Sequence, residues 1–102
     1  AAVTKIAPED PLGWYNLGTI LYAGEDYQNA ALALERAVGI QNDYANALFL
    51  LGLSYAKLDR DAEALSVLKA AAALNPTDAA LGTIIANISA GRDPFAGLSA
   101  PK

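Results

Sequence analysis

The side chains most able to do chemistry in this sequence form two small clusters of acids. Glu25 and Asp26 are adjacent, and Asp59, Asp61 and Glu63 alternate along one short stretch. Paired carboxylates can act as general acid and base, and alternating ones supply oxygen ligands for calcium. The second cluster lacks the glycine and the distant glutamate that close a calcium loop. Both clusters fall where we expect turns and helix starts, so we predict capping and solvation for them, with no catalytic or metal site.

The residue types that most enzymes and metal sites need are missing. The 102 residues contain no histidine and no cysteine, so the commonest general base, the commonest metal ligand and any disulfide are absent. Gly24, Gly39 and Gly91 are isolated and form no phosphate-binding loop. We therefore predict that the protein is not an enzyme and holds no cofactor.

The charge balance narrows the classes of partner. Seven basic residues stand against eleven acidic ones, for a formal net charge of −4. This balance argues against nucleic acid and against an anionic membrane surface. No apolar run approaches ~18 residues, so we predict no membrane insertion. The sequence contains no methionine, and we expect a processed product or a piece of something longer. The compartment stays open between cytoplasmic and extracytoplasmic.

The sequence repeats itself with a period of 34 residues. Trp14-x-x-Leu17-Gly18 returns as Leu48-x-x-Leu51-Gly52, and Ala30-x-x-x-Leu34-x-x-Ala37 returns as Ala64-x-x-x-Leu68-x-x-Ala71. A fixed period of this size marks an array of identical supersecondary units. The apolar spacing inside each unit is helical. We predict an all-α structure with helices at about 11–23, 27–39, 45–57, 61–73 and 78–90, and turns at 24–26 and 58–60.

The expected helix ends carry suitable residues. Asp10-Pro11 supplies an N-cap acceptor followed by a proline at the first helical position. Asn75-Pro76 is expected to do the same for the last helix, and Gly91 to end it. Residues 92–102 have no period and contain two prolines and a glycine, so we predict an extended tail.

Over roughly residues 1–91 the repeated motif resembles the tetratricopeptide repeat, a helix-turn-helix unit of the same period. The resemblance implies a right-handed α-solenoid with repeats at about 11–44 and 45–78 and a capping helix at 78–90. It also implies that Gly18, Gly52, Ala30 and Ala64 lie where the two helices of one unit cross closely. Three positions depart from the family pattern: Leu48 replaces the tryptophan, Asn42 replaces the proline, and Gly82 replaces a large residue.

In this family the first helices of successive units line a groove in which ligands, usually peptides, lie. Carried over by register, the lining residues are Leu12, Tyr15, Asn16, Thr19, Tyr22, Asn46, Phe49, Leu50, Leu53, Thr83 and Asn87. None is basic, so the clamp by which some members hold a C-terminal carboxylate is absent. An apolar helix, an extended peptide or a sugar suits such a lining. Alternatively, the aromatic residues simply pack against one another.

Three functions follow from these patterns. The first is a non-catalytic scaffold that binds another protein or peptide. The second is a structural subunit that assembles head to tail with further copies of itself into a filament. Its contacts would come from exposed apolar residues at the two ends of the chain, namely Val3, Ile6, Ile84, Ile85 and Ile88.

The third function rests on the C-terminal segment. Ala86-Asn87-Ile88-x-Ala90-Gly91-Arg92-x-Pro94-x-x-Gly97 is similar to the ends of tetratricopeptide segments that follow bacterial membrane polysaccharide polymerases or ligases. On this reading the chain is an appendage of a larger cell-envelope protein. The same segment holds Asn87-Ile88-Ser89, which has the pattern of a glycosylation acceptor inside a predicted helix.

Overall fold

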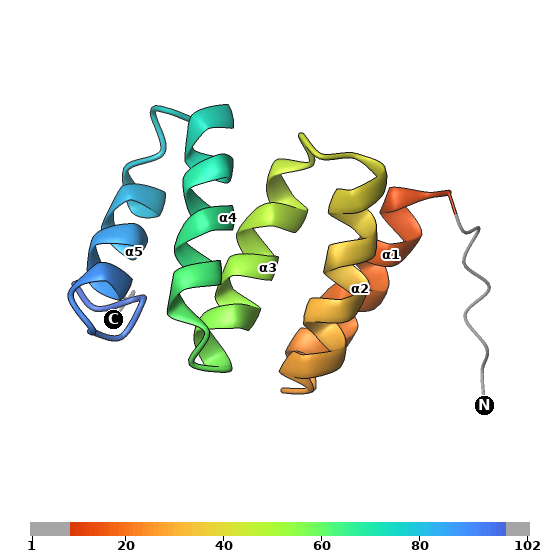
Figure 1. The fold of residues 1–102 in the computed structure, drawn as a ribbon, viewed down its shortest axis with the longest axis horizontal. Helices are drawn as coiled ribbons and strands as arrows, with labels where there is room; N and C mark the ends of the chain where they lie inside the picture. The colour runs from red at the N-terminus through yellow and green to blue at the C-terminus, as the bar shows by residue number, and fades with distance from the viewer. Residues whose placement is uncertain (1–8, 98–102) are drawn as a thin grey trace, which may run out of the picture.

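The computed structural model describes residues 9–97. Within that range it contains five α-helices and no strand: α1 (Pro11–Ala23), α2 (Tyr27–Ile40), α3 (Ala45–Lys57), α4 (Asp61–Leu74) and α5 (Ala79–Ser89). The helices stand side by side in chain order, each packed on the next (Figure 1). The predicted all-α solenoid is therefore confirmed, with every helix boundary within one residue of its expected position. Val3, Ile6 and residues 98–102 lie outside the described residues.

Aspartates begin three of the helices. The carboxylates of Asp10, Asp26 and Asp78 accept hydrogen bonds from the backbone N–H groups of Leu12, Asn29 and Leu81, at 3.0, 3.4 and 3.1 Å. Each bond satisfies a donor that has no partner inside its helix.

The cap of the last helix differs from the sequence prediction. We expected Asn75 to supply the N-cap of this helix, but Asp78 occupies the N-cap position. The reason is a turn in between, because the Asp78 N–H donates to the Asn75 carbonyl oxygen at 3.1 Å. Pro76 and Thr77 lie within this turn, before the helix begins.

One acidic residue follows the C-cap of the first helix in each of the two units. Glu25 and Asp59 have φ values of 64° and 60°, in the left-handed region that side-chain-bearing residues seldom enter. They are 34 residues apart and therefore occupy the same position in successive units. The next residues, Asp26 and Arg60, donate their backbone N–H to the carbonyls of Leu21 and Tyr55, each at 2.9 Å. The turns expected at 24–26 and 58–60 are thus confirmed.

The two helices of each unit meet at a glycine. A Cβ atom added at Gly18 would lie 2.6 Å from Cγ of Leu34, and one added at Gly52 would lie 2.4 Å from Cγ of Leu68. Leu34 and Leu68 are both completely buried by these contacts and their neighbours. Ala30 and Ala64 are also fully buried beside them. The predicted close crossing of the two helices is therefore confirmed in both units.

The second helix of one unit then packs on the first helix of the next. At this α2–α3 interface the Tyr55 hydroxyl donates a hydrogen bond of 2.5 Å to Oε2 of Glu35. The guanidinium of Arg60 lies 4.6 Å from the centre of the Tyr55 ring and forms an ion pair of 2.6 Å with Glu63. Burial first, and then the hydrogen bond to Glu35, raise the pKa of Tyr55. A carboxylate on one unit thus binds a phenol on the next.

The glycine contacts make a quantitative prediction. Gly18→Ala and Gly52→Ala should each lower the free energy of unfolding by about 1–3 kcal/mol, because the added methyl group overlaps a buried leucine. The matched control is Gly82→Ala in α5, where an added Cβ meets no atom within 4 Å. It should raise the free energy of unfolding by about 0.5–1 kcal/mol through helix propensity alone. Urea denaturation followed by circular dichroism measures all three, and equal effects at the three positions would contradict the close crossing.

The phenol–carboxylate contact makes a second prediction. Tyr55→Phe should lower the free energy of unfolding at neutral pH by about 1 kcal/mol, because Glu35 loses its hydrogen-bond donor. Tyr27→Phe is the matched control and should change it by less than about 0.5 kcal/mol, because the Tyr27 hydroxyl makes no hydrogen bond within residues 9–97.

The same pair predicts how stability depends on pH. The pKa of Tyr55 is higher in the folded state than in the unfolded state, where it is about 10. The stabilisation that this residue contributes to folding is therefore complete at pH values below about 10. That contribution disappears as the pH rises above that value. The parent should therefore lose stability above pH ~10 more steeply than Tyr55→Phe, and parallel curves would show that the phenol is not held by the fold.

Candidate functional site

The predicted lining residues lie on the first helices of the units, and we call this surface the first-helix face. On α1, Tyr15, Thr19 and Tyr22 share one side of the helix, because they are four and three residues apart. On α3, Phe49 stands 34 residues after Tyr15, and α1 contacts α3 directly. The fold therefore brings the predicted residues of the first two units onto adjacent helices.

Two pairs of tyrosines lie along this face. The rings of Tyr15 and Tyr44 have centroids 5.1 Å apart, and those of Tyr22 and Tyr27 are 5.3 Å apart in an edge-on arrangement. The ammonium group of Lys57 lies 5.8 Å from the centre of the Tyr27 ring. Each of the two predicted tyrosines therefore packs against a tyrosine outside the predicted set. Sequence reasoning missed Tyr27 and Tyr44. Tyr27 is the first residue of α2, and Tyr44 is the N-cap residue of α3.

The pKa values of two phenols on this face, those of Tyr22 and Tyr44, are raised. Burial first, and then the neighbouring Tyr27, raise the pKa of Tyr22. Burial, Tyr15 and Asp10, in that order, raise the pKa of Tyr44. In the part of the chain that the structure describes, the hydroxyls of Tyr15, Tyr22, Tyr27 and Tyr44 make no hydrogen bond to protein. Each can therefore donate to a ligand or to water.

The predicted residues differ in how far a ligand can reach them. Leu12 is 53% exposed, and Asn16, Thr19 and Asn46 are also exposed. Tyr15, Tyr22, Phe49, Leu50 and Thr83 are half-buried, whereas Leu53 is only 5% exposed and belongs to the core. The accessible part of the face thus lies on α1 and α3 and combines apolar, aromatic and amide groups.

The side chain of Asn87 binds the segment that follows α5 and is not available on the first-helix face. Its side-chain N–H groups donate to the backbone carbonyls of Pro94 and Ala96 at 2.9 and 2.7 Å, and its oxygen accepts from Arg92 at 3.2 and 3.3 Å. The described part of the predicted extended tail, residues 92–97, therefore turns back onto the end of α5. Because Asn87 is 3% exposed and its amide nitrogen is engaged, the folded chain does not offer it for glycosylation.

The isoleucines expected to form an end-to-end contact are mostly buried. Ile84 and Ile88 are 2% and 5% exposed, and Ile85 is half-buried. The head-to-tail hypothesis required these three side chains to be about half exposed. Ile84 and Ile88 instead pack within the chain's own core, and Ile85 packs against it with part of its surface exposed, so α5 offers less apolar surface than that hypothesis expects.

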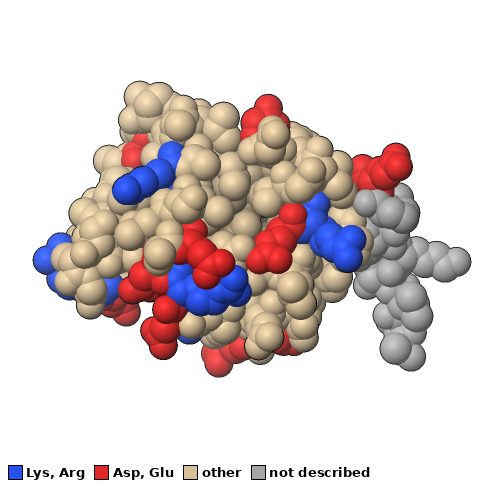
Figure 2. Space-filling view, viewed as in Figure 1, with Lys and Arg blue, Asp and Glu red and all other residues tan. Residues whose placement is uncertain are grey.

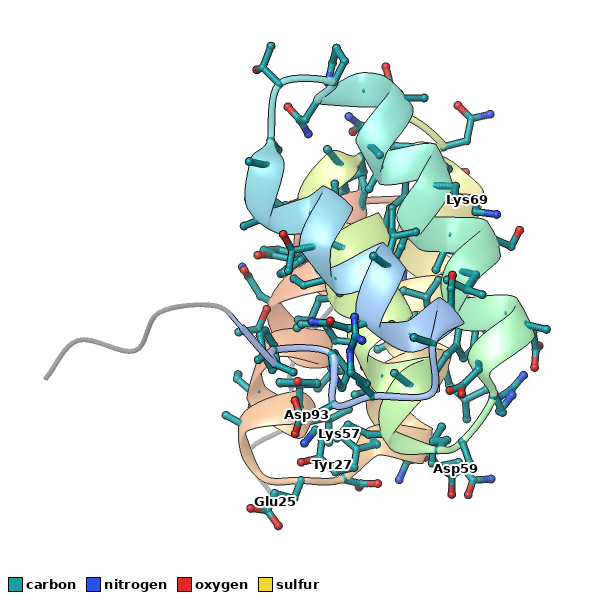
Figure 3. All side chains as sticks on the ribbon, turned by 90° about the vertical axis from the view of Figure 1, so that its left-hand side faces the viewer. Glu25, Tyr27, Lys57, Asp59, Lys69 and Asp93 are labelled. Carbon is teal, nitrogen blue, oxygen red and sulfur yellow. The ribbon has the colours of Figure 1, made fainter. Side chains whose placement is uncertain are left out.

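The acidic clusters lie in the turns after α1 and α3 and in the first turn of α4. The turns after α1 and α3 and the end of α5 lie at one end of the helices, and Figure 3 shows Glu25, Tyr27, Lys57, Asp59 and Asp93 at this end. Asp59, Asp61, Arg92 and Asp93 border a hollow of about 220 Å³. The Glu63 carboxylate is bound instead by Arg60, whose hydrogen bond lowers the pKa of Glu63. Residues 9–97 contain no group of three or more acids suited to a metal ion.

The surface otherwise carries mixed charge. Figure 2 shows acidic and basic side chains interleaved on the face drawn, between broad uncharged areas. None of the described helices is both long and apolar enough to cross a membrane.

A surface groove that sequence reasoning missed lies between α1 and α2. It has a volume of about 340 Å³ and is lined by Trp14, Leu17, Leu21, Asn29, Leu32, Ala33 and Arg36. None of these residues belongs to the predicted lining set. Ile20, also on α1, is 67% exposed, and Leu32 is 55% exposed. The 34-residue period alone does not predict this groove. Leu51 and Ser54, which are the equivalents of Leu17 and Ile20 in the second unit, are both buried.

Comparison with known proteins agrees with the repeat geometry. A family model described as Tetratricopeptide repeat matches residues 1–45 and residues 15–79. A search of curated proteins found no match.

The Asn87 hydrogen bonds make a testable prediction. Asn87→Ala should lower the free energy of unfolding by about 1–3 kcal/mol, because two backbone carbonyls lose their donors at a partly buried site. It should also speed the hydrogen exchange of the Arg92 and Ala96 amides, which turns hold in the parent. Asn16→Ala, at an exposed asparagine of α1, is the control and should leave both measurements unchanged. Unaltered exchange in Asn87→Ala would show that the turn does not depend on this side chain.

Proposed function

Because this chain belongs to the tetratricopeptide repeat family, we propose that it is a protein–protein interaction module whose ligand lies across the first-helix face. Repeats of this family generally mediate protein–protein interaction or scaffolding and are typically non-catalytic. The proposed ligand is a peptide segment with apolar or aromatic side chains. The observation that carries the proposal is the run of partly exposed aromatic residues, Tyr15, Tyr44 and Phe49, across two adjacent helices.

The chemistry of the face supports a peptide over other ligands. Half-buried aromatic rings provide large, rigid contact area, and such residues dominate the energetics of peptide recognition. Around them, Asn16 and Asn46 are exposed and can pair with the backbone of an extended or helical segment. The free phenol hydroxyls add donors for peptide carbonyls. Because the predicted lining contains no basic residue, an internal segment suits this face better than a terminal carboxylate.

Selection of peptides displayed on phage against the full chain tests this proposal. Selected peptides should carry an apolar or aromatic anchor, and their affinity should fall about tenfold or more in Tyr15→Ala or Phe49→Ala, as for buried aromatic hot spots. Leu74→Ala removes an apolar side chain of 44% exposure on α4 and is the matched control.

Isothermal titration of one selected peptide with each variant provides the measurement, after circular dichroism has shown that the variants are folded. Peptides that bind both aromatic variants as tightly as the parent would contradict the proposal. Failure to select any peptide over background would also contradict it.

A further inference from the structure

An acidic residue stands at the start of each first helix. The starts of α1, α3 and α5 lie at the same end of the row of helices (Figure 1). Asp10 and Asp78 are the N-cap residues of α1 and α5, and Asp43 directly precedes Tyr44, the N-cap residue of α3. All three acidic residues are exposed. We call Asp10, Asp43 and Asp78 the acidic rim of the first-helix face.

The acidic rim has no basic residue close to it on the helices that meet there. α1 and α5 contain no lysine or arginine, and the one on α3 is its last residue, Lys57. At ~1.5 Å per residue, Lys57 lies about 18 Å from the start of α3, roughly twice the ~8 Å screening length at physiological ionic strength. α2 and α4, which end near the rim, carry no basic residue in their last turns. Within residues 9–97 none of the three rim carboxylates forms an ion pair.

A pair of aromatic rings lies beside this rim. Tyr44 follows Asp43 in the chain, and its ring packs on that of Tyr15. Asp10 is close enough to be among the causes that raise the pKa of Tyr44. Both tyrosines are half-buried, so each keeps part of its surface open to a ligand. Two carboxylates and two rings thus form one subsite at the start of α1 and α3.

Other aromatic residues of the chain show what this subsite lacks. Three rings each have a basic side chain of the chain itself at 4.6–5.8 Å from the ring centre. The pairs are Arg36 with Trp14, Lys57 with Tyr27, and Arg60 with Tyr55. In the described part of the chain no lysine or arginine lies over Tyr15 or Tyr44. A cation from a ligand fits this place, because ring faces and carboxylates both attract positive charge.

We propose that the peptide ligand of the first-helix face carries a lysine or arginine, whose side chain lies on the Tyr15–Tyr44 pair and faces Asp10 and Asp43. This inference rests on the proposed function and names the chemistry that selects the peptide. The apolar or aromatic anchor of the same peptide lies further along the face, towards Phe49. An acidic residue in place of the lysine or arginine would be repelled by the rim.

Parallel phage selections on the full chain and on two of its variants test this inference. Asp10→Asn/Asp43→Asn removes both carboxylates of the subsite and keeps a side chain that can cap α1. The matched control, Asp61→Asn/Asp78→Asn, removes the same charge in the first turn of α4 and at the start of α5. Peptides selected on the parent and on the control should be enriched in lysine and arginine beside the anchor. Those selected on Asp10→Asn/Asp43→Asn should show no such enrichment.

A double-mutant cycle measures the contact itself. One selected peptide is titrated calorimetrically with its basic residue present or replaced by glutamine. In the parent this replacement should weaken binding by about three- to thirtyfold, as for an exposed cation–π contact combined with an ion pair. In Asp10→Asn/Asp43→Asn the loss should be at least about twofold smaller, and in the control variant it should equal that of the parent. Added salt should weaken the parent peptide more than the glutamine peptide.

The outcomes separate this inference from the proposed function. Peptides that depend on Tyr15 and Phe49 but carry no excess of basic residues would overturn the inference and leave the proposed function standing. A basic residue that is equally important in Asp10→Asn/Asp43→Asn would do the same. Failure to select any peptide, or peptides that ignore both aromatic variants, would overturn both.

A lysine of this chain is the competing occupant of the subsite. Lys5 and Lys102 lie outside the described residues. Lys5→Gln and Lys102→Gln should leave the affinity for the selected peptide unchanged. Tighter binding in either variant would show that the chain's own lysine occupies the subsite, and would overturn the inference.

Discussion

The contact between a glycine of the first helix and a leucine of the second sets the geometry of each unit. Gly18 meets Leu34 and Gly52 meets Leu68 at distances that leave no room for a side chain. Because the two helices approach so closely, the leucine is completely buried and its neighbours Ala30 and Ala64 close the remaining space. The angle between the helices is fixed there, and it determines which residues face the next unit.

Stacking then follows from this unit geometry. Glu35 of the first unit reaches Tyr55 of the second across the α2–α3 interface. Ser54 on α3 is completely buried, whereas its equivalent Ile20 on α1 is 67% exposed. The first-helix face and the α1–α2 groove are therefore products of one arrangement, since the former is exposed along the stack and the latter at its end.

The sequence predicted the helices well because the information for them is local and repeated. The helical spacing of leucines and alanines, the 34-residue period and the cap at Asp10 all lie within a few turns of the residues they organise. Gly18 and Gly52 were recognisable because only a very small residue satisfies the crossing in both units.

Features that depend on contacts between distant residues were harder to predict. The turn after α5 depends on the Asn87 side chain and the carbonyls of Pro94 and Ala96, and neither the prolines nor the glycine there reveals it. Tyr44 joins the first-helix face only through the fold. The exposure of Ile20 could not be inferred from residue type, because the equivalent Ile88 has the same side chain and is buried.

The most direct test of the central claim is a double-mutant cycle on Gly18 and Leu34, measured by urea denaturation. If the close crossing holds the unit, Leu34→Ala removes the atoms that a new methyl group at position 18 would strike. Gly18→Ala should then cost at least about 1 kcal/mol less in the Leu34→Ala background than in the parent, as expected for residues in contact. Effects that add to within about 0.3–0.5 kcal/mol would contradict the claim that this contact sets the geometry of the repeat.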